Sequence, residues 1–339
     1  MQVMSEIRQN IATRQWVIIA PNRGKRPEDL QSASRPEREL PDRDANCPFC
    51  PGNEHMLPGI TLEVPGPGSD GWQTRVVPNK FPALTRERNP RRYSRDIYKA
   101  MPGYGQHEVI IETPRHDQDI PQMSVEEVKT LVETYHKRYV DAMKDDHHMM
   151  TIIFRNHGWQ AGPSLLHPHS QLIATGIVPR AIRRREEEAL RYFDERGQCV
   201  FCDILAFEIR DRRRVILEND TFLAFVPFAA EVPFEVWIVP RRHQAGFGEI
   251  SDEEKAGLAY ALREVLAGLH SRLGDPDYNY VVNSSGRHRA GEPHLHWHLR
   301  IRPRLTIPAG FEIGSGMAIN PSIPEEDAAF LKAVGAPTE

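Results

Sequence analysis

Two segments of the chain carry apolar side chains at the spacing of an amphipathic helix. Each begins with a serine that is followed three residues later by a glutamate, at residues 124–143 and 251–273. This Ser-x-x-Glu pattern is a capping box, in which each side chain bonds the backbone N–H of the other residue. Apolar residues that recur every three or four positions predict a helix with one buried face. The stripes consist of Leu131, Val132 and Tyr135, and of Leu258, Leu262, Val265, Leu266 and Leu269.

The surroundings of these two helices repeat along the chain. "HEVIIETPRHDQDIPQMSVEEV" begins at residue 107, and "FEVWIVPRRHQAGFGEISDEEK" begins 127 residues later, at 234. Both blocks are read as a strand, a histidine and a capping box, and each helix is followed by another strand, "MMTIIFRN" or "YNYVVNSS". Strands joined through a long helix predict an α+β fold. We therefore expect two tandem halves, residues 1–180 and 181–339, each an antiparallel sheet with a packed helix.

A third strand is predicted at "SLLHPHSQLIATG", residues 164–176. Side chains two residues apart share a face of a strand, so His167, His169 and Gln171 lie on one face. Pro168, Ser170 and Leu172 would then occupy the other face. Two imidazoles and an amide in a row indicate a site for chemistry or for metal binding.

The four cysteines form two Cys-x-x-Cys pairs, one in each half. In a cytosolic chain such pairs indicate metal ligation or redox chemistry. Prolines and a glycine around the first pair favour a turn, and hence structural zinc with two further ligands at each site. The repeat supplies those ligands as histidines, and in the second half either His294 or His296 is available. The expected sets are Cys47, Cys50, His116 and His167, and Cys199, Cys202, His243 and one of His294 or His296.

If His167 binds a metal, His169 remains on the same face as a candidate nucleophile. An imidazole is largely unprotonated near neutral pH and can attack phosphorus. Gln171 could donate its amide N–H to a phosphate oxygen and stabilise the transition state. The loop "NHGWQAGPS" contains small residues whose N–H groups could approach phosphates. The alternative is that His169 is a second metal ligand or a buried, hydrogen-bonded histidine.

Composition limits the class of protein. The chain has 339 residues, 40% of them hydrophobic, and a formal net charge of −4, so no global charge favours nucleic acid or an anionic membrane. No apolar run reaches the length of a membrane-spanning helix, and the N-terminus lacks the apolar core of a signal peptide. We expect a cytoplasmic protein with neither nucleic acid nor membrane as a partner.

Cys-x-x-Cys, "HPHSQ" and a second histidine-rich strand together resemble the galactose-1-phosphate uridylyltransferase family of the histidine-triad superfamily. The resemblance extends from "WVIIAPNRGKRP" through "RVVPNKFPAL" to "GFEIGSGMAINP". It implies two histidine-triad-like halves, with the catalytic "HPHSQ" in the first. The second half is expected to be a degenerate copy, because "HLHWHLR" has no glutamine at the position matching Gln171.

The resemblance also implies a ping-pong reaction. His169 would attack the α-phosphate of a nucleoside diphosphate sugar and release a sugar 1-phosphate, and a second sugar phosphate or another anion would then take the nucleotide. The default is transfer of UMP between UDP-hexose and hexose 1-phosphate, in an enzyme that could be a homodimer. The residues implied to hold the nucleotide and its phosphates, besides Gln171, are Arg23, Arg26, Asn79, Phe81, Asn156, Gly162 and Ser164.

The C-terminal segment departs from the family pattern. The resemblance implies a lysine at its start and Tyr-Glu near its end for phosphate and sugar recognition, whereas this chain has Gly310, Ser315 and Gly316. The segment, the second Cys-x-x-Cys and "HSQ" are closer to the ADP-glucose phosphorylase branch, which transfers AMP to phosphate and whose second zinc histidine matches His296. A two-residue insertion in the loop "SSGRHRAGEP" would reconcile this match with the ungapped repeat, so His296 is the expected ligand. A rival of another class is a zinc-stabilised nucleotide-binding protein without turnover. The intact "HPHSQ" argues against that rival.

Overall fold

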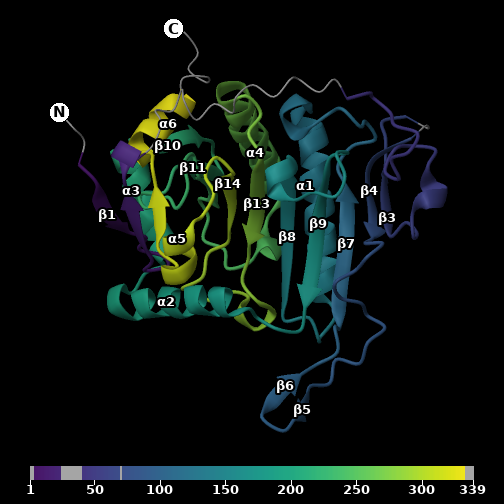
Figure 1. The fold of residues 1–339 in the computed structure, drawn as a ribbon, viewed down its shortest axis with the longest axis horizontal. Helices are drawn as coiled ribbons and strands as arrows, with labels where there is room; N and C mark the ends of the chain where they lie inside the picture. Colours follow the sequence, from purple (N-terminus) through teal and green to yellow (C-terminus); the bar gives the residue numbers. More distant parts are fainter. Residues whose placement is uncertain (1–3, 24–39, 69–70, 333–339) are drawn as a thin grey trace.

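The structure is a computed structural model that describes residues 4–23, 40–68 and 71–332. Within these ranges a ten-stranded sheet runs through the molecule in the order β10-β11-β12-β14-β13-β8-β9-β7-β4-β3, and all its pairs are antiparallel (Figure 1). The first half supplies β3 (Leu62–Pro65), β4 (Trp72–Pro78), β7 (Gly105–Ile111), β8 (Met150–His157) and β9 (His169–Thr175). The second supplies β10 (Val215–Glu218), β11 (Phe222–Phe225), β12 (Val236–Pro240), β13 (Tyr278–Asn283) and β14 (His298–Pro303).

The sheet repeats itself about the junction between β8 and β13. Outward from that junction the order is β8-β9-β7-β4-β3 on one side and β13-β14-β12-β11-β10 on the other. Each strand of the first half thus has a counterpart in the second. The expected α+β class with antiparallel sheets is confirmed, and the two halves share one continuous sheet.

The two predicted helices pack on one face of this sheet. They are α1 (Val125–Met143) and α4 (Asp252–Leu273), and each begins with the predicted capping box, from Ser124 or Ser251. Their apolar stripes join a single core with strand residues such as Leu172 and Leu299. Burying a leucine side chain contributes about 1.5–3 kcal/mol, so these stripes hold the helices on the sheet. Because His169 and Leu172 point to opposite faces of β9, the histidine lies on the face that α1 and α4 leave free.

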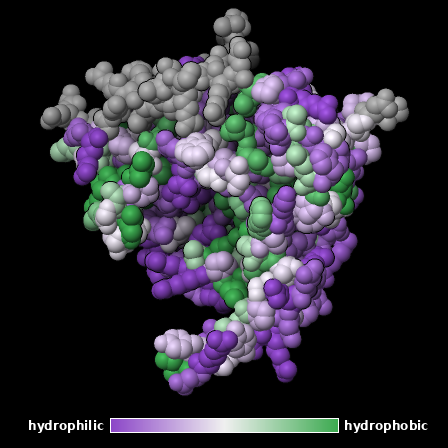
Figure 2. Space-filling model, turned by 45° about the vertical axis from the view of Figure 1, so that its right-hand side comes forward, coloured by the Kyte–Doolittle hydropathy of each residue, from purple (hydrophilic) through white to green (hydrophobic). Residues whose placement is uncertain are grey.

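The remaining elements surround the large sheet. A three-stranded sheet joins both ends of the chain, since β2 pairs antiparallel with β1 and parallel with β15. A short hairpin projects from the body in Figure 1 and forms the protrusion at the bottom of Figure 2. The strands concerned are β1 (Glu6–Gln9), β2 (Trp16–Ile19), β15 (Ala318–Asn320), and β5 (Tyr93–Arg95) with β6 (Tyr98–Ala100) in the hairpin. The other helices are α2 (Arg180–Arg196), α3 (Val200–Asp211), α5 (Gly310–Ser315) and α6 (Pro324–Lys332). Of the helices described, none combines the length and apolar character needed to cross a bilayer.

Candidate functional site

The two histidines of "HPHSQ" stand at the start of β9, which lies between β8 and β7 in the sheet. His169 is the first residue of this strand and pairs with Ile111 of β7, and Ser170 pairs with Arg155 of β8. Ser170 and Leu172 are fully buried on the helix side. The strand therefore presents His169 and Gln171 on the opposite face, as the alternation of the sequence predicts.

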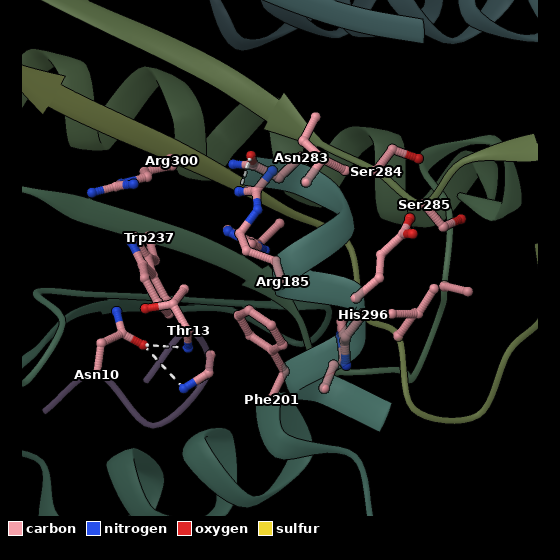
Figure 3. A pocket seen from close by; sticks show the side chains of 17 residues that line it. Asn10, Thr13, Arg185, Phe201, Trp237, Asn283, Ser284, Ser285, His296 and Arg300 are labelled. Carbon is pink, nitrogen blue, oxygen red and sulfur yellow. Dashed lines mark hydrogen bonds between the residues drawn. The ribbon is translucent and has the colours of Figure 1, made fainter. Parts of the chain in front are cut away.

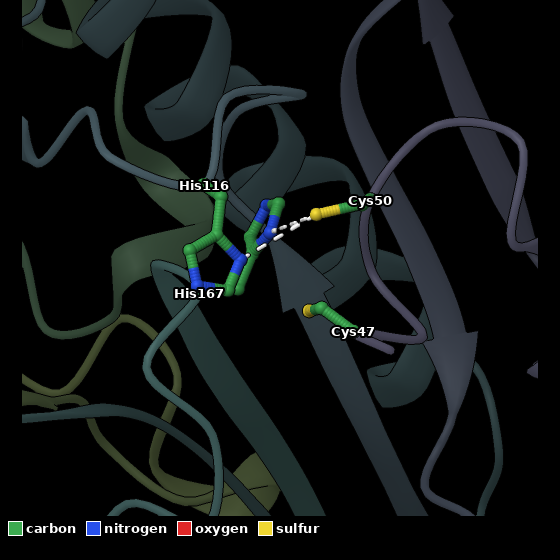
Figure 4. Close-up of side chains that lie close together, drawn as sticks. All are labelled: Cys47, Cys50, His116 and His167. Atoms are coloured by element: carbon green, nitrogen blue, oxygen red, sulfur yellow. Dashed lines mark hydrogen bonds between the residues drawn. The ribbon is translucent and has the colours of Figure 1, made fainter. Parts of the chain in front are cut away.

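Four buried side chains converge beside the start of β9: Cys47, Cys50, His116 and His167 (Figure 4). Their candidate ligand atoms all lie within 4.8 Å of one another. The Sγ of Cys50 is 3.4 Å from Nδ1 of His116 and 3.6 Å from Nδ1 of His167. The Nε2–H of His167 donates to the carbonyl of Thr113 at 2.8 Å, which leaves the lone pair of Nδ1 facing the cysteines.

The second half has a matching cluster of Cys199, Cys202, His243 and His296. The Sγ of Cys202 lies 3.4 Å from Nδ1 of His243 and 3.7 Å from Nδ1 of His296. The Nε2–H of His296 donates to the carbonyl of Pro240 at 3.0 Å, as His167 does to Thr113. Both clusters offer the two thiols and two imidazoles of a tetrahedral Cys2His2 site.

The second cluster contains His296 and not His294, to which the uninterrupted offset of 127 residues points. His167 follows Asn156 by 11 residues, whereas His296 follows Asn283, the counterpart of Asn156, by 13. The longer loop shifts the register by two residues and carries His294 away, so that its Nδ1 lies 3.7 Å from Glu292. The ungapped repeat pointed to His294 and the family resemblance to His296, and the structure places His296 among the cysteines.

Burial sets the charge state of the first cluster. It raises the pKa of the Cys47 thiol to about 11 and lowers the pKa of His167 to about 4. A neutral imidazole is the form that binds a metal, and a bound cation offsets the cost of a buried thiolate. The donor set and its burial therefore fit a divalent metal ion.

His169 is oriented by its own strand. Its Nδ1–H donates to the main-chain carbonyl of His167 at 2.8 Å, so the lone pair of the neutral ring lies on Nε2. Burial lowers the pKa of His169, and the positive charge of Arg155 lowers it further. The ring of Phe49, from the Cys-x-x-Cys turn, meets the ring of His169 edge-on at 5.4 Å between centroids. The result is an unprotonated imidazole in a fixed orientation, which is what a nucleophile requires.

His107, which the sequence did not single out, lies on the neighbouring strand β7 and contacts Gln171. The main-chain N–H of Ala83 donates to Nδ1 of His107 at 3.1 Å, so Nε2 carries the proton. That proton is donated to Oε1 of Gln171 at 2.8 Å, and the NH₂ group of Gln171 forms no hydrogen bond with any residue that the structure describes. Asn79 lies 3.2 Å from the same Nε2. The sequence contains one sign that His107 is specific to the first half, since the matching position of the second repeat is Phe234.

The other expected site residues fall into three groups. Asn79 accepts from the main-chain N–H of Phe81, a residue that is 85% exposed, and its side chain lies 3.2 Å from Nε2 of His107, the partner of Gln171. Asn156 follows Arg155 on β8 and therefore lies next to His169, and Gly162 and Ser164 belong to the loop between β8 and β9. Gly162 has a φ of +85°, a conformation that suits glycine. Arg23 ends the short helix η1 (Pro21–Arg23), outside the hydrogen bonds described around His169, and Arg26 lies outside the described residues.

Comparison with known proteins decides the family. Sequence models of galactose-1-phosphate uridyl transferase match this chain, that of the N-terminal domain over residues 1–179 and that of the C-terminal domain over residues 185–306. This chain belongs to the galactose-1-phosphate uridylyltransferase family. The resemblance carried by "HPHSQ" is thereby confirmed.

Two branches of this family are similar to the chain over almost its whole length. ADP-glucose phosphorylase of Arabidopsis thaliana is 34% identical over 333 residues, 97% of this chain and 93% of that protein. Galactose-1-phosphate uridylyltransferase of Thermotoga maritima is 29% identical over 339 residues, 97% of this chain and 98% of that protein. The crystal structure of the Arabidopsis enzyme with bound ADP-glucose has a TM-score of 0.83 at 33% identity, covering 98% of this chain and 100% of that one. A uridylyltransferase structure reaches 0.75 at 28% identity, covering 97% and 98%.

In this uridylyltransferase-family chain a buried polar network supports β9 from the helix side. The hydroxyl of Ser170, the residue between His169 and Gln171, donates to Glu112. Glu112 also accepts from Nε of Arg155 at 2.9 Å and from the hydroxyl of Tyr135 at 3.1 Å. Burial raises the pKa of Glu112, opposed by the charge of Arg155. A fully bonded network of this kind limits movement of the strand that carries both candidate catalytic residues.

Proposed function

We propose that this protein transfers a nucleotidyl group from a nucleoside diphosphate hexose to an acceptor through a covalent intermediate on His169. The observation that carries the proposal is the hydrogen bond from Nδ1–H of His169 to the carbonyl of His167, which leaves Nε2 as the nucleophilic atom. Membership of the uridylyltransferase family and the position of Gln171 two residues later support it.

The proposed reaction has two displacements. In the first, the Nε2 lone pair of His169 attacks the α-phosphorus, an N–P bond forms, and hexose 1-phosphate leaves with the electron pair of the broken P–O bond. In the second, an oxygen of the acceptor attacks the same phosphorus and the N–P bond breaks, which restores the neutral imidazole. The NH₂ group of Gln171, which bonds none of the described residues while Oε1 is held by His107, would donate to a nonbridging oxygen.

We further propose that both Cys2His2 clusters hold zinc as structural sites. Cys47, Cys50, His116 and His167 would bind the first ion, and Cys199, Cys202, His243 and His296 the second. One ion would tie the turn of Cys47 and Cys50 to the loop that precedes β9, and the other would tie the start of α3, where Cys199 and Cys202 lie, to the loop that precedes β14. In the first half, zinc would thereby hold the segment on which His169 depends.

Of the two donors considered, ADP-glucose is favoured, with inorganic phosphate as acceptor. The hydroxyl of Ser315 donates to the carbonyl of Phe311 at 2.6 Å and accepts from the N–H of Met317 at 3.1 Å. It is thus occupied in closing α5, at a position where the family pattern has a sugar-binding side chain. The 34% identity to ADP-glucose phosphorylase supports the same branch. Uridylyl transfer between UDP-hexose and hexose 1-phosphate is the second candidate, supported by the Thermotoga maritima relative.

The function is tested by intact-protein mass spectrometry after brief incubation with ADP-glucose or with UDP-glucose. An added AMP group supports the phosphorylase reaction, and an added UMP group supports the second candidate. The His169→Asn variant serves as the control and should gain neither group. If the wild-type chain gains no nucleotide from either donor while still binding it, the covalent mechanism is wrong.

A further inference from the structure

The second half contains a counterpart of the His169 site. His298 is the first residue of β14, as His169 is of β9, and each lies two residues after a histidine of a Cys2His2 cluster. Asn283 pairs with His298 across β13 and β14, in the position that Asn156 takes beside His169. The repeat therefore brings the same two residue types together at a second place, where the side chains surround a pocket (Figure 3).

The features that favour catalysis are missing at this second place. The Nδ1 of His298 makes no hydrogen bond of normal geometry in the described part of the chain, although the carbonyl of His296 is near. Its ring stacks on Phe201 at 4.6 Å and lies 5.1 Å from the ring of Trp237. Arg300, in the position of Gln171, is engaged by Glu235 at 2.7 Å and 3.0 Å. These contacts leave a pocket without an oriented nucleophile.

A positively charged side chain from outside the repeated segments lines this pocket. Arg185 comes from α2, and its Nη1 donates to Oδ1 of Asn283 at 2.6 Å (Figure 3). No carboxylate of the described residues lies within 4.0 Å of its guanidinium, which has five N–H donors. Burial and the charge of Arg300 lower the pKa of Arg185 to about 10, and the carboxylates of Glu186 and Glu231 only partly oppose them. An incompletely paired guanidinium of this kind favours an anionic ligand.

The other groups around the pocket define the size and chemistry of that ligand. The cavity has a volume of about 70 Å³, and Asn10, Thr13 and Ser285 contribute neutral polar groups to its wall. A single water needs about 10–15 Å³ on the same measure, so the space holds a group of a few atoms. Glu186 also lines it, and its Oε1 lies 3.4 Å from the N–H of Gly286. That carboxylate favours a ligand that also carries hydroxyl donors.

We propose that the second half binds a phosphate group in this cavity, without chemistry, through Arg185, Asn283 and the neighbouring hydroxyls. The guanidinium fork matches two oxygens of a phosphate, and Asn283 holds the fork in place. The phosphate can come from inorganic phosphate or from a hexose 1-phosphate, whose sugar hydroxyls would reach Glu186. The site is separate from the His169 site and does not depend on which nucleotide that site takes.

The test is equilibrium dialysis of radiolabelled inorganic phosphate and, separately, of glucose 1-phosphate with the full-length protein. Arg185→Gln should bind one phosphate group fewer per chain than the wild type, or bind it at least about tenfold more weakly, because hydrogen bonds to a charged group are lost. Arg184→Gln, at the exposed neighbouring position of α2, should behave as the wild type. If Arg185→Gln loses the binding of only one of the two probes, that probe identifies the source of the phosphate group.

Two further measurements separate this site from the active site and from misfolding. The yield of nucleotidyl-His169 should be unchanged in Arg185→Gln, since this residue is outside that site. Arg185→Lys keeps the charge and should keep binding at reduced affinity, even if the glutamine variant is unstable. Binding of the same number of phosphate groups with the same Kd in wild type, Arg185→Gln and Arg185→Lys would overturn the proposal.

Discussion

The Nδ1–H of His169 bonds to the carbonyl of His167 at 2.8 Å, and the imidazole of His167 in turn faces Cys50. The candidate nucleophile is therefore oriented by a residue that belongs to the Cys2His2 cluster. The candidate nucleophile and a candidate metal ligand thus lie within three consecutive positions of the chain. Variants can separate the two, because His169 itself contributes no atom to the cluster.

Replacing His169 by asparagine should abolish the covalent intermediate. We expect kcat to fall by about 10⁴-fold or more, with substrate binding changed little, because a covalent nucleophile is lost. Metal content and Tm should stay at the wild-type values, since the cluster is intact. Kinetics, metal analysis and thermal unfolding on one preparation check this. A labelled intermediate that still forms, or a loss of metal, would contradict the assignment.

Gln171 and His107 should differ in the size of their effects. Gln171→Ala removes the proposed transition-state donor and should lower kcat by about 10²-fold to 10³-fold. His107→Phe, which installs the residue of the second half, removes only the bond that orients Gln171, so the loss should be smaller, about tenfold. His107→Gln can still donate to Oε1 of Gln171 and should recover part of the lost kcat. Equal losses for Gln171→Ala and His107→Phe would show that His107 has a direct role.

Metal analysis should find about two zinc ions per chain, one for each complete ligand set. Cys47→Ser should retain about one ion and lower the Tm, because a structural metal contributes to folding. It should also reduce the yield of nucleotidyl-enzyme, since His167 carries the carbonyl that orients His169. Cys199→Ser is the matched control and should lower stability with less effect on that yield. Native protein without metal and with four titratable thiols would rule out this prediction.

The dependence of stability on pH should contain a contribution from His157. Burial alone would lower its pKa, but Asp119 at 2.7 Å and Asp275 at 2.9 Å outweigh burial and raise the pKa from 6.5 to about 9. The folded state then holds a proton that the unfolded state has lost, so the stabilisation is complete below about pH 6.5 and disappears as the pH rises through about 9. Over this pH range the free energy of unfolding should fall by up to about 3 kcal/mol through this group.

Denaturant unfolding at several pH values checks this contribution. His157→Gln should be less stable than the wild type at neutral pH and should show a flatter decline between pH 6.5 and 9, the range set by the two pKa values. His55→Gln replaces an exposed histidine and should follow the wild-type curve. Parallel curves for His157→Gln and wild type would show that the ion pairs do not control stability in this range.

Several features were determined by the sequence alone. The capping boxes at Ser124 and Ser251, the helices that follow them and the alternation around His169 were all predicted, because each depends on hydrogen bonds and side-chain periods within a few residues. The repeat also predicted the cysteine and histidine order of both clusters. Duplication preserves the order of ligands even where loops differ in length.

Other features were decided only by the tertiary structure. The pairing of β8 with β13 makes one sheet of two halves. His107 contacts Gln171 from the neighbouring strand β7, and Arg185 contacts Asn283 from helix α2. These relationships join residues far apart in the chain, and strand register and packing set them. Neither leaves a local pattern in the sequence.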